Sequence, residues 1–423
     1  MNRSAPVPPL AYSGGTLHMD GVELEAVAGA VGTPAYVYGA DHIAQQYEAL
    51  TQAFAATPHH IHYAVKANSN IAVLELLHRL GAGFDIVSGG ELSRLLAIDV
   101  DPKQIVFSGV GKSTAEITFA LQSGVGCLNI ESAAELVRTE QIARQSGLRA
   151  PISLRVNPNV DANTHPYIST GLKDNKFGVP VAQAFALYEQ AAASAHLDVV
   201  GIDCHIGSQI GQLEPLLEAL ASLLDLVDRL STIGVELQHI DVGGGFGITY
   251  ADEQPLDIAA YGAAVGQMMG SRPQKILLEP GRMIVANAGV LLTRVEYLKP
   301  GEKNFAVVDA AMNDLIRPAL YQAWHPVHNL RAAGGADEAD LVWDIVGPVC
   351  ESGDFLAKQR TTHLQAGDVL AIGGAGAYGF VQASNYNSRP RPCEVLIQNG
   401  QFHVVRRRES IQDLLSLEQR LPR

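Results

Sequence analysis

The sequence contains few cysteines and no long apolar run. Its cysteines lie far apart, without any CxxC pair, at Cys127, Cys204, Cys350 and Cys393. This spacing argues against a disulfide scaffold or a thiolate zinc site and predicts a reducing, cytoplasmic environment. No run of roughly 18 uncharged apolar residues is present, and the N-terminal residues lack the apolar core of a signal peptide. We therefore expect no membrane association.

Basic residues are also in short supply. The 423 residues include 30 Lys and Arg against 44 Asp and Glu, which gives a formal net charge of −14 and no basic block. An acidic chain of this kind is a poor candidate for binding nucleic acid or an anionic membrane. An anionic ligand would have to be bound by local groups, such as helix N-termini or individual arginines. The hydrophobic fraction of 47% predicts a large folded core, and the length suits two domains.

Short β-branched runs alternate with helical patterns through the first two thirds of the chain. The expected strands are 61–65, 84–87, 105–107, 127–130, 152–156, 199–205, 239–242 and 276–278. The expected helices are 41–56, 71–80, 91–97, 115–122, 133–145, 182–193, 213–233 and 258–269. Eight strand and helix pairs favour a closed (β/α)8 barrel, a TIM barrel, over an open doubly wound parallel sheet.

The pattern changes after the eighth strand. Short strands separated by Gly, Pro and Asn are expected at 290–298, 305–308, 341–346, 369–372, 394–397 and 402–405. We therefore predict a barrel over residues 39–285 and a mostly β domain, a barrel or sandwich, over 286–423. The N-terminal segment 1–38 is expected to contribute to this β domain.

Unusual polar residues follow nearly every predicted barrel strand. They are Lys66, Asp85, Arg155, His205, Ser208, the glycines 243–245, Glu279 and Arg282. Each has an ordinary explanation when taken alone: a solvated lysine, a core histidine, a tight glycine turn, or a glutamate paired with an arginine. In a (β/α)8 barrel, however, the C-terminal strand ends converge on one mouth, where catalytic groups gather.

The combination of these residues favours one cofactor. Glycines leave backbone N–H groups free to approach a phosphate. A lysine such as Lys66 forms a Schiff base with an aldehyde, and a carboxylate such as Glu279 keeps a pyridine nitrogen protonated. The flat imidazole of His205 can lie against a ring. Phosphate, aldehyde and pyridine together describe pyridoxal 5′-phosphate.

The motifs resemble those of the fold-type III pyridoxal-phosphate enzymes, the alanine racemase and ornithine decarboxylase group, and most closely the diaminopimelate decarboxylases. The resemblance covers nearly the whole chain. It is carried by the motifs at 63–68, 165–178, 204–209, 243–247, 279–282, 347–354, 376–379 and 384–387. The segments His165–Gly178 and Cys350–Ser352 are the ones closest to the diaminopimelate enzymes.

The resemblance implies a role for each matching residue. Lys66 resembles the cofactor-bearing lysine, His205 the residue stacked on the ring, and Glu279 the partner of the pyridine nitrogen. The other implied cofactor contacts are Asp85, Ser208, Gly244, Gly245, Gly281, Arg282 and Tyr378. The implied substrate ligands are Arg282, Arg317, Tyr321, Glu351 and Tyr378. Cys350 resembles the proton donor, and its loop enters the partner subunit's site in this family, which implies a homodimer with shared sites.

Chemistry favours diaminopimelate, whose decarboxylation gives L-lysine and completes lysine biosynthesis. Its distal end carries a carboxylate, which suits the arginine forks of Arg282 and Arg317, and an ammonium, which suits Glu351. A thiol such as that of Cys350 is protonated at neutral pH and can donate to carbon, although a small buried hydrophobe is its ordinary alternative.

Three other functions remain open at this point. A racemase would need a second base, usually a tyrosine, where this sequence has Cys350. A decarboxylase of ornithine, arginine or carboxynorspermidine would differ only in the pocket for the distal end of its substrate. A non-catalytic pyridoxal-phosphate-binding regulatory protein on the same barrel should have lost Lys66 or Cys350, and both are present.

Overall fold

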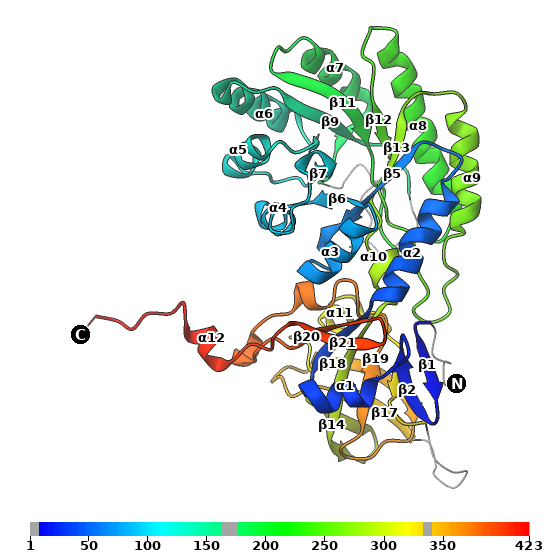
Figure 1. Ribbon diagram of the computed structural model, residues 1–423, viewed down its shortest axis with the longest axis vertical. Coiled ribbons are helices and arrows are strands. Elements are labelled where there is room, and N and C mark those ends of the chain that lie inside the picture. Colours follow the sequence, from blue (N-terminus) through cyan, green and yellow to red (C-terminus); the bar gives the residue numbers. More distant parts are fainter. Residues whose placement is uncertain (1–7, 162–175, 333–340, 423) are drawn as a thin grey trace. The chain divides into compact units, whose positions relative to one another are not determined.

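The computed structural model describes residues 8–161, 176–332 and 341–422 of the chain. It divides into two compact units, which are described separately below (Figure 1). The barrel unit comprises Gln46–Thr249 and Glu253–Met283. The sheet unit comprises Met1–Gln45, Tyr250–Asp252 and Ile284–Arg423.

The barrel unit is built on eight parallel strands that close on themselves. They are β5 (His59–Ala64), β6 (Gly83–Ile86), β7 (Ile105–Phe107), β8 (Cys127–Ile130), β9 (Ala150–Asn157), β11 (Leu197–Asp203), β12 (His239–Asp241) and β13 (Lys275–Leu278). Closure comes from the β8–β9 and β13–β5 pairings, and the short β10 (Val179–Pro180) adds to β9. The predicted (β/α)8 barrel is confirmed, and the open sheet is excluded.

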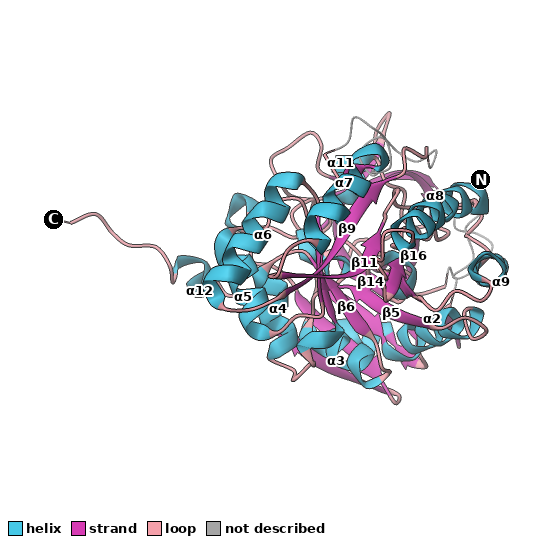
Figure 2. Ribbon diagram, turned by 90° about the horizontal axis from the view of Figure 1, so that it is seen from above, coloured by secondary structure: helices cyan, strands magenta, loops and turns pink. Residues whose placement is uncertain are grey.

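Helices connect successive strands and lie around the outside of them (Figure 2). They are α3 (Ile71–Arg79), α4 (Gly89–Leu96), α5 (Thr114–Ser123), α6 (Ala133–Ser146), α7 (Val181–Ala192), α8 (Leu213–Ser231) and α9 (Ile258–Met269), with α2 (Ala40–Ala53) ahead of β5. Serine side chains accept hydrogen bonds from the first turns of α4, α5 and α6, at Ser88, Ser113 and Ser132. These N-caps fix where the helices start after each strand.

The apolar stripe of α8 illustrates how the helices are held. Leu216, Leu220, Leu223 and Leu230 recur at helical spacing and are buried, whereas Asp225 on the other face is exposed. Burying such a stripe stabilises the helix on the sheet by about 1.5–3 kcal/mol per large side chain. The packing leaves the strand ends available for polar residues.

The sheet unit contains a mixed sheet with the order β18-β17-β15-β14-β4-β20-β21. Its strands are β4 (Ala35–Gly39), β14 (Gly289–Lys299), β15 (Asn304–Val308), β17 (Leu341–Val346), β18 (Phe355–Thr362), β20 (Cys393–Gln398) and β21 (Gln401–Arg406). The strand β19 (Val369–Ile372) pairs with β14 and with β16 (Val327–Asn329). A separate small sheet consists of β1 (Leu10–Ser13), β2 (Thr16–Met19) and β3 (Val22–Glu23).

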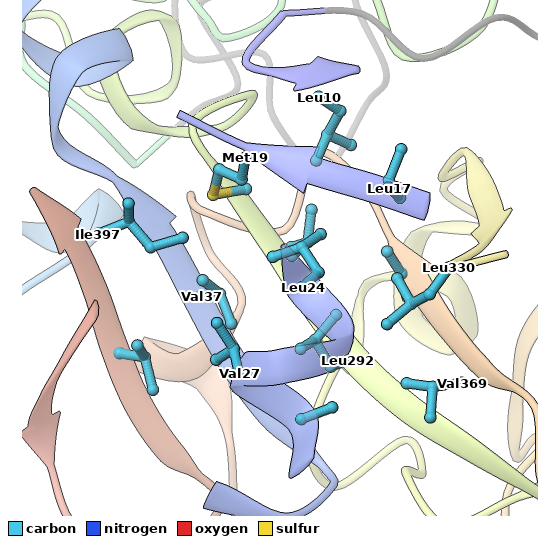
Figure 3. Close-up of a cluster of buried hydrophobic side chains, with 14 residues drawn as sticks. Leu10, Leu17, Met19, Leu24, Val27, Val37, Leu292, Leu330, Val369 and Ile397 are labelled. Atoms are coloured by element: carbon cyan, nitrogen blue, oxygen red, sulfur yellow. The ribbon is translucent and has the colours of Figure 1, made fainter. Parts of the chain in front are cut away.

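Short helices complete this unit. They are α1 (Leu24–Val31), α10 (Arg282–Val285, which begins at the end of the barrel unit), α11 (Arg317–Tyr321) and α12 (Ile411–Leu415). The N-terminal strand β4 lies between β14 and β20, antiparallel to the first and parallel to the second. The core beside it gathers Leu24 and Val27 of α1, Val37 of β4, Leu292 of β14 and Ile397 of β20 (Figure 3).

Several elements of the sheet unit depart from the sequence expectations. The helices α1, α11 and α12 and the strand β16 were not expected, and neither was the strand β18. Its second half, Lys358–Thr362, lacks any apolar residue, so alternation gave no signal there. Across the described ranges 8–161, 176–332 and 341–422, no helix combines the length and apolarity needed to cross a lipid bilayer.

Candidate active site

Lys66 lies at the C-terminal end of the first barrel strand, in a 3₁₀ turn (Val65–Ala67) that follows β5. Its ammonium forms an ion pair with Asp85 of the neighbouring strand β6. The Asp85 carboxylate is fully buried, while 35% of the Lys66 side chain is exposed. Lys66 and Asp85, each expected in the site from the sequence, therefore meet at the C-terminal end of the barrel strands, and the Lys66 side chain remains partly exposed.

The glycine run after β12 is required by backbone geometry. Gly243 and Gly245 have φ values of 68° and 84°, in the left-handed region that side chains disfavour. A Cβ at Gly244 would lie 2.0 Å from the carbonyl oxygen of Glu279. The run thus lets the ends of β12 and β13 approach closely.

The N–H groups of this run differ from the sequence expectation. Gly243 donates to Asp241 Oδ1 at 2.9 Å, and Gly244 donates to His205 Nδ1 at 3.2 Å. These two groups are engaged within the protein instead of being left free for a phosphate. The reason is that Asp241 ends β12 two residues before Gly243, while His205 follows the adjacent strand β11.

His205 lies just beyond β11 and is partly buried. Burial, followed by the positive charges of Arg155 and Lys66, holds the pKa of its imidazole well below the ordinary value. Because Nδ1 accepts the Gly244 N–H, the single proton of the neutral ring sits on Nε2. The site therefore offers a neutral flat ring of fixed orientation, which suits stacking.

Ser208 and Arg282 come together in the barrel unit. Arg282 Nη2 donates to Ser208 Oγ at 3.1 Å, and Arg282 is 8% exposed. Gly281 packs against the turn that carries Lys66, because a Cβ there would lie 2.9 Å from Ala67 Cβ. The backbone N–H of Ala64 also donates to Pro280 O at 3.0 Å. A guanidinium and a hydroxyl, held beside the lysine turn, are a suitable anion-binding pair.

A group of buried carboxyls lies below the mouth. One carboxyl oxygen each of Asp203, Asp241 and Glu279 lies within 4.8 Å of the others. Burial and then the neighbouring acids raise the pKa of Glu279 well above its ordinary value, and burial raises the pKa of Asp241 to about 7. Within the described part of the chain, the buried atom Asp203 Oδ1 has no hydrogen-bond partner, while a hydrogen bond with Glu279 partly offsets the effect of burial on the pKa of Asp241. The group therefore holds protons at neutral pH.

Arg155 supplies a buried positive charge beside these acids. Its guanidinium bonds Glu131 at 3.0 Å and lies 3.9 Å from Asp203. Glu131 also accepts the backbone N–H groups of Gly109 and Gly178, at 3.0 and 2.9 Å. Arg155 thus neutralises part of the acidic charge under the mouth. Because its guanidinium is engaged in this way, Arg155 does not serve as an accessible ligand for an anion.

In the sheet unit, the predicted substrate ligands Arg317 and Tyr321 begin and end helix α11. The Arg317 guanidinium is buried, with its Nη1 2.9 Å from His325 Nε2 and its Cζ 4.7 Å from the centre of the Tyr250 ring. Tyr321 is partly buried. The arginine is therefore held in place by aromatic rings.

Cys350 and Glu351 lie on an exposed loop of the same unit. The backbone N–H of Cys350 donates to Asn387 Oδ1 at 3.1 Å, and the Tyr386 hydroxyl donates to the Glu351 carboxylate. Asp354 closes the loop. Its carboxylate accepts the N–H groups of Val349 and Met312, both at 2.7 Å. The thiol and the carboxylate thus project from an anchored loop.

Tyr378 occupies a strained turn of the sheet unit. Its φ of 55° is unusual for a bulky residue, and it follows Gly376, where a Cβ would lie 1.9 Å from Val285 O. Such strain is common at functional sites. Of the motif His165–Gly178, residues 165–175 lie outside the described residues.

Comparisons with known proteins agree with this geometry. Residues 40–286 match the family model "Pyridoxal-dependent decarboxylase, pyridoxal binding domain". The chain is 56% identical to a diaminopimelate decarboxylase of Pseudomonas aeruginosa over 97% of its length and 99% of the relative's. This chain belongs to the diaminopimelate decarboxylase family. The resemblance inferred from the motifs is confirmed.

Solved structures of the family support the assignment. The Helicobacter pylori diaminopimelate decarboxylase complexed with L-lysine has a TM-score of 0.90 at 42% identity, covering 93% of this chain and 99% of its own. The M. jannaschii enzyme in co-complex with L-lysine has a TM-score of 0.92 at 35% identity, covering 99% and 98%. The likeness extends over both units of the chain.

Several residues of the site were given no individual role from the sequence. They are Asp203, Asp241, Glu131, His325, Asp354 and Asn387. Asp241 was noted only as a polar residue at a strand end, and Asp354 and Asn387 only as parts of motifs. Asp203 and Asp241 are the last residues of two adjacent parallel strands, so their position was a usable signal. Asn387 lies in the motif 384–387, which was a usable signal, whereas His325 lies outside the motifs and outside regular strands, and its tertiary contacts identify it.

Proposed function

We propose that this protein binds pyridoxal 5′-phosphate in its barrel unit and decarboxylates meso-2,6-diaminopimelate to L-lysine and carbon dioxide. The observation that carries the proposal is the convergence at one barrel mouth of the accessible Lys66 amine, the neutral His205 ring and the proton-holding Glu279. Family membership at 56% identity supports the same reaction.

The residues of the mouth fit this cofactor. Lys66 would hold its aldehyde carbon, Glu279 would face its ring nitrogen, and His205 would lie on its ring. Ser208 and Arg282, already joined at 3.1 Å, would bind its phosphate, together with Gly245 and Tyr378. When bound, pyridoxal phosphate supplies an electron sink for the carbon that loses carbon dioxide.

The acids below the mouth supply the protons that this arrangement needs. Glu279 is buried against Asp241 and Asp203, so it retains a proton until a more basic group is placed beside it. Glu279 would hold this proton against the ring nitrogen of the cofactor, and its carboxyl group would balance the charge there. Asp85 balances the positive charge of the Lys66 ammonium.

The substrate ligands of the sheet unit suit diaminopimelate. Arg317 can bind the distal carboxylate by paired N–H donors, and Glu351 can accept from the distal ammonium. The Cys350 thiol would donate the proton to carbon after carbon dioxide leaves. A substrate with only a distal amine would leave Arg317 without its anion, which disfavours ornithine.

We also propose a homodimer in which the Cys350–Glu351 loop of one subunit completes the site of the other. The exposed position of the loop supports this arrangement, since its tip is available to a second chain. Cysteine usage supports a reducing cytoplasmic location.

The deciding experiment incubates the purified protein with meso-diaminopimelate and pyridoxal phosphate and measures carbon dioxide and lysine. We expect both products in equal amounts, with Lys66→Ala inactive. Ornithine, arginine, carboxynorspermidine and D-lysine serve as competing substrates in parallel reactions. Preferential turnover of any of these would contradict the proposed substrate. Racemised diaminopimelate without carbon dioxide would contradict the proposed reaction.

A further inference from the structure

The contacts of His325 define its protonation state. Arg317 Nη1 lies 2.9 Å from His325 Nε2, and a guanidinium nitrogen can only donate, so Nε2 accepts. His325 Nδ1 lies 2.8 Å from the carbonyl oxygen of Gly373, which can only accept, so Nδ1 carries the proton. The ring is therefore a neutral Nδ1–H tautomer. A second ring proton would face the guanidinium N–H and break the contact.

The backbone holds His325 equally firmly. Its carbonyl oxygen accepts from Arg360 Nη2 at 3.0 Å, and the Arg360 guanidinium lies 4.3 Å from the Trp324 ring. The adjoining Pro326 carbonyl accepts the Gly373 N–H at 2.8 Å. Hence the imidazole is fully buried and fixed at both nitrogens and at its backbone.

His325 also contacts Tyr250. Its ring meets the His325 imidazole edge to face, with centres 5.4 Å apart and planes at 73°. The same tyrosine ring lies under the Arg317 guanidinium at 4.7 Å. Gly374 makes room for this arrangement, because a Cβ there would lie 2.9 Å from the Tyr250 ring. One nitrogen and one aromatic face therefore define the plane of the guanidinium.

We propose that His325 is a positioning residue that holds Arg317 in the orientation required to bind the distal carboxylate of the substrate. This inference rests on the proposed function, which makes Arg317 a carboxylate ligand. The imidazole that contacts the guanidinium is uncharged, so this contact orients the arginine without neutralising the positive charge that an anionic substrate needs. A carboxylate in place of His325 would orient Arg317 but neutralise it.

The test separates orientation from simple stability. Diaminopimelate and its product L-lysine share the distal carboxylate, whereas cadaverine lacks it. Calorimetry on the holoenzyme therefore compares the binding of L-lysine and cadaverine in His325→Phe, which keeps an aromatic ring, and in His325→Gln, which keeps an acceptor. His328→Phe is the matched control, since His328 is a buried histidine of the same unit.

We expect His325→Phe to weaken L-lysine binding and raise the KM for diaminopimelate by about tenfold, from the loss of a hydrogen bond to a charged group. Cadaverine affinity and kcat should change by less than about threefold. His325→Gln should recover most of the L-lysine affinity, and His328→Phe should preserve it fully. Equal losses for both ligands, or no loss in His325→Phe, would overturn the proposal.

Two further measurements keep the inference falsifiable. If Arg317→Ala leaves the L-lysine to cadaverine ratio unchanged, the proposed role of Arg317 fails. If Arg317→Ala changes that ratio and His325→Phe does not, only the role of His325 fails.

Nitrogen NMR of the histidines in the unsubstituted protein is the second measurement. The signal of His325, which is assigned because it is absent from His325→Gln, should be that of the Nδ1–H tautomer near neutral pH. An Nε2–H tautomer or a doubly protonated ring would overturn the inference without depending on the folding of His325→Phe.

Discussion

The backbone N–H of Gly244 donates to Nδ1 of His205 over 3.2 Å. A peptide group, fixed by the approach of two barrel strands, therefore orients the imidazole. Burial and the charges of Arg155 and Lys66 hold the pKa of His205 well below its ordinary value, so the ring stays neutral through the neutral range. The glycine turn therefore fixes the orientation of the histidine ring.

The variant Gly244→Ala tests whether the glycine turn positions the histidine ring. Its Cβ would lie 2.0 Å from Glu279 O, a backbone atom, so β12 and β13 must separate. We expect a loss of about 1–3 kcal/mol in stability and weaker cofactor binding. Thermal unfolding and fluorescence titration with pyridoxal phosphate measure the two effects. Gly29→Ala is the control, because nothing lies within 4 Å of its added Cβ. Equal behaviour of the two variants would contradict the assigned role of Gly244.

Lys66 should be the lysine that carries the cofactor. Its amine is accessible at the mouth and pairs with the buried Asp85. Borohydride treatment of the loaded protein, followed by peptide mass mapping, should locate the label on Lys66. Lys112 is a suitable internal control, since its ammonium is buried against Glu135 at 2.7 Å. A label on any lysine other than Lys66 would refute the assignment.

Asp241→Asn should change how stability depends on pH. Burial raises the pKa of Asp241 from 3.8 to about 7 in the folded protein, so folding is progressively disfavoured as pH rises from 3.8 through 7. The asparagine cannot ionise, and its oxygen can still accept the Gly243 N–H. The Tm of the cofactor-free variant relative to the unsubstituted protein should therefore rise by a few degrees between about pH 5 and about pH 8.

The neighbouring acids Asp203 and Glu279, whose pKa values are also raised by burial, are present in both proteins, so the comparison uses the difference in Tm between variant and unsubstituted protein. Asp225→Asn is the matched control, because 75% of the Asp225 side chain is exposed. Its Tm difference should not depend on pH. A difference for Asp241→Asn that also stays constant would show that Asp241 is not the group carrying the proton.

A shared site predicts complementation between two inactive variants. Lys66→Ala and Cys350→Ala homodimers should each be nearly inactive. After subunit exchange, half of the dimers are mixed, and one of the two sites in each mixed dimer keeps both native residues. Activity should recover to about a quarter of that of the unsubstituted enzyme. Exchange is verified by native mass spectrometry, and exchange without recovery would place Lys66 and Cys350 of each site in one chain.

The sequence predicted the barrel well because its periodicity is strong. Strand 105–107 and helix 258–269, for example, were placed at the bounds that the structure gives them. The hydrogen-bond partners of individual side chains were harder to predict from the sequence. Two of the glycine N–H groups were expected to be free, yet Asp241 and His205 accept them. The bond from Gly243 to Asp241 is local, whereas the bond from Gly244 to His205 depends on how the neighbouring strands β11 and β12 lie side by side.

His325 shows the same limit in the sheet unit. Its spacing from Arg317 suggests nothing, since Gln322 between them adopts a left-handed conformation that ends the helix. Its partner Gly373 is distant in sequence. Tyr250 belongs to the short segment Tyr250–Asp252 of the sheet unit, which lies in the sequence between two segments of the barrel unit. Such contacts depend on the topology of the fold, which local sequence patterns do not reveal.

Asp354 gives the Cys350–Glu351 loop a property that matters for assembly. By accepting the N–H groups of Val349 and Met312, its carboxylate restricts the loop before any second chain arrives. The conformational entropy of that segment is lost during folding of the subunit, not during association. In the proposed homodimer, association would therefore require little further ordering of the loop that carries Cys350.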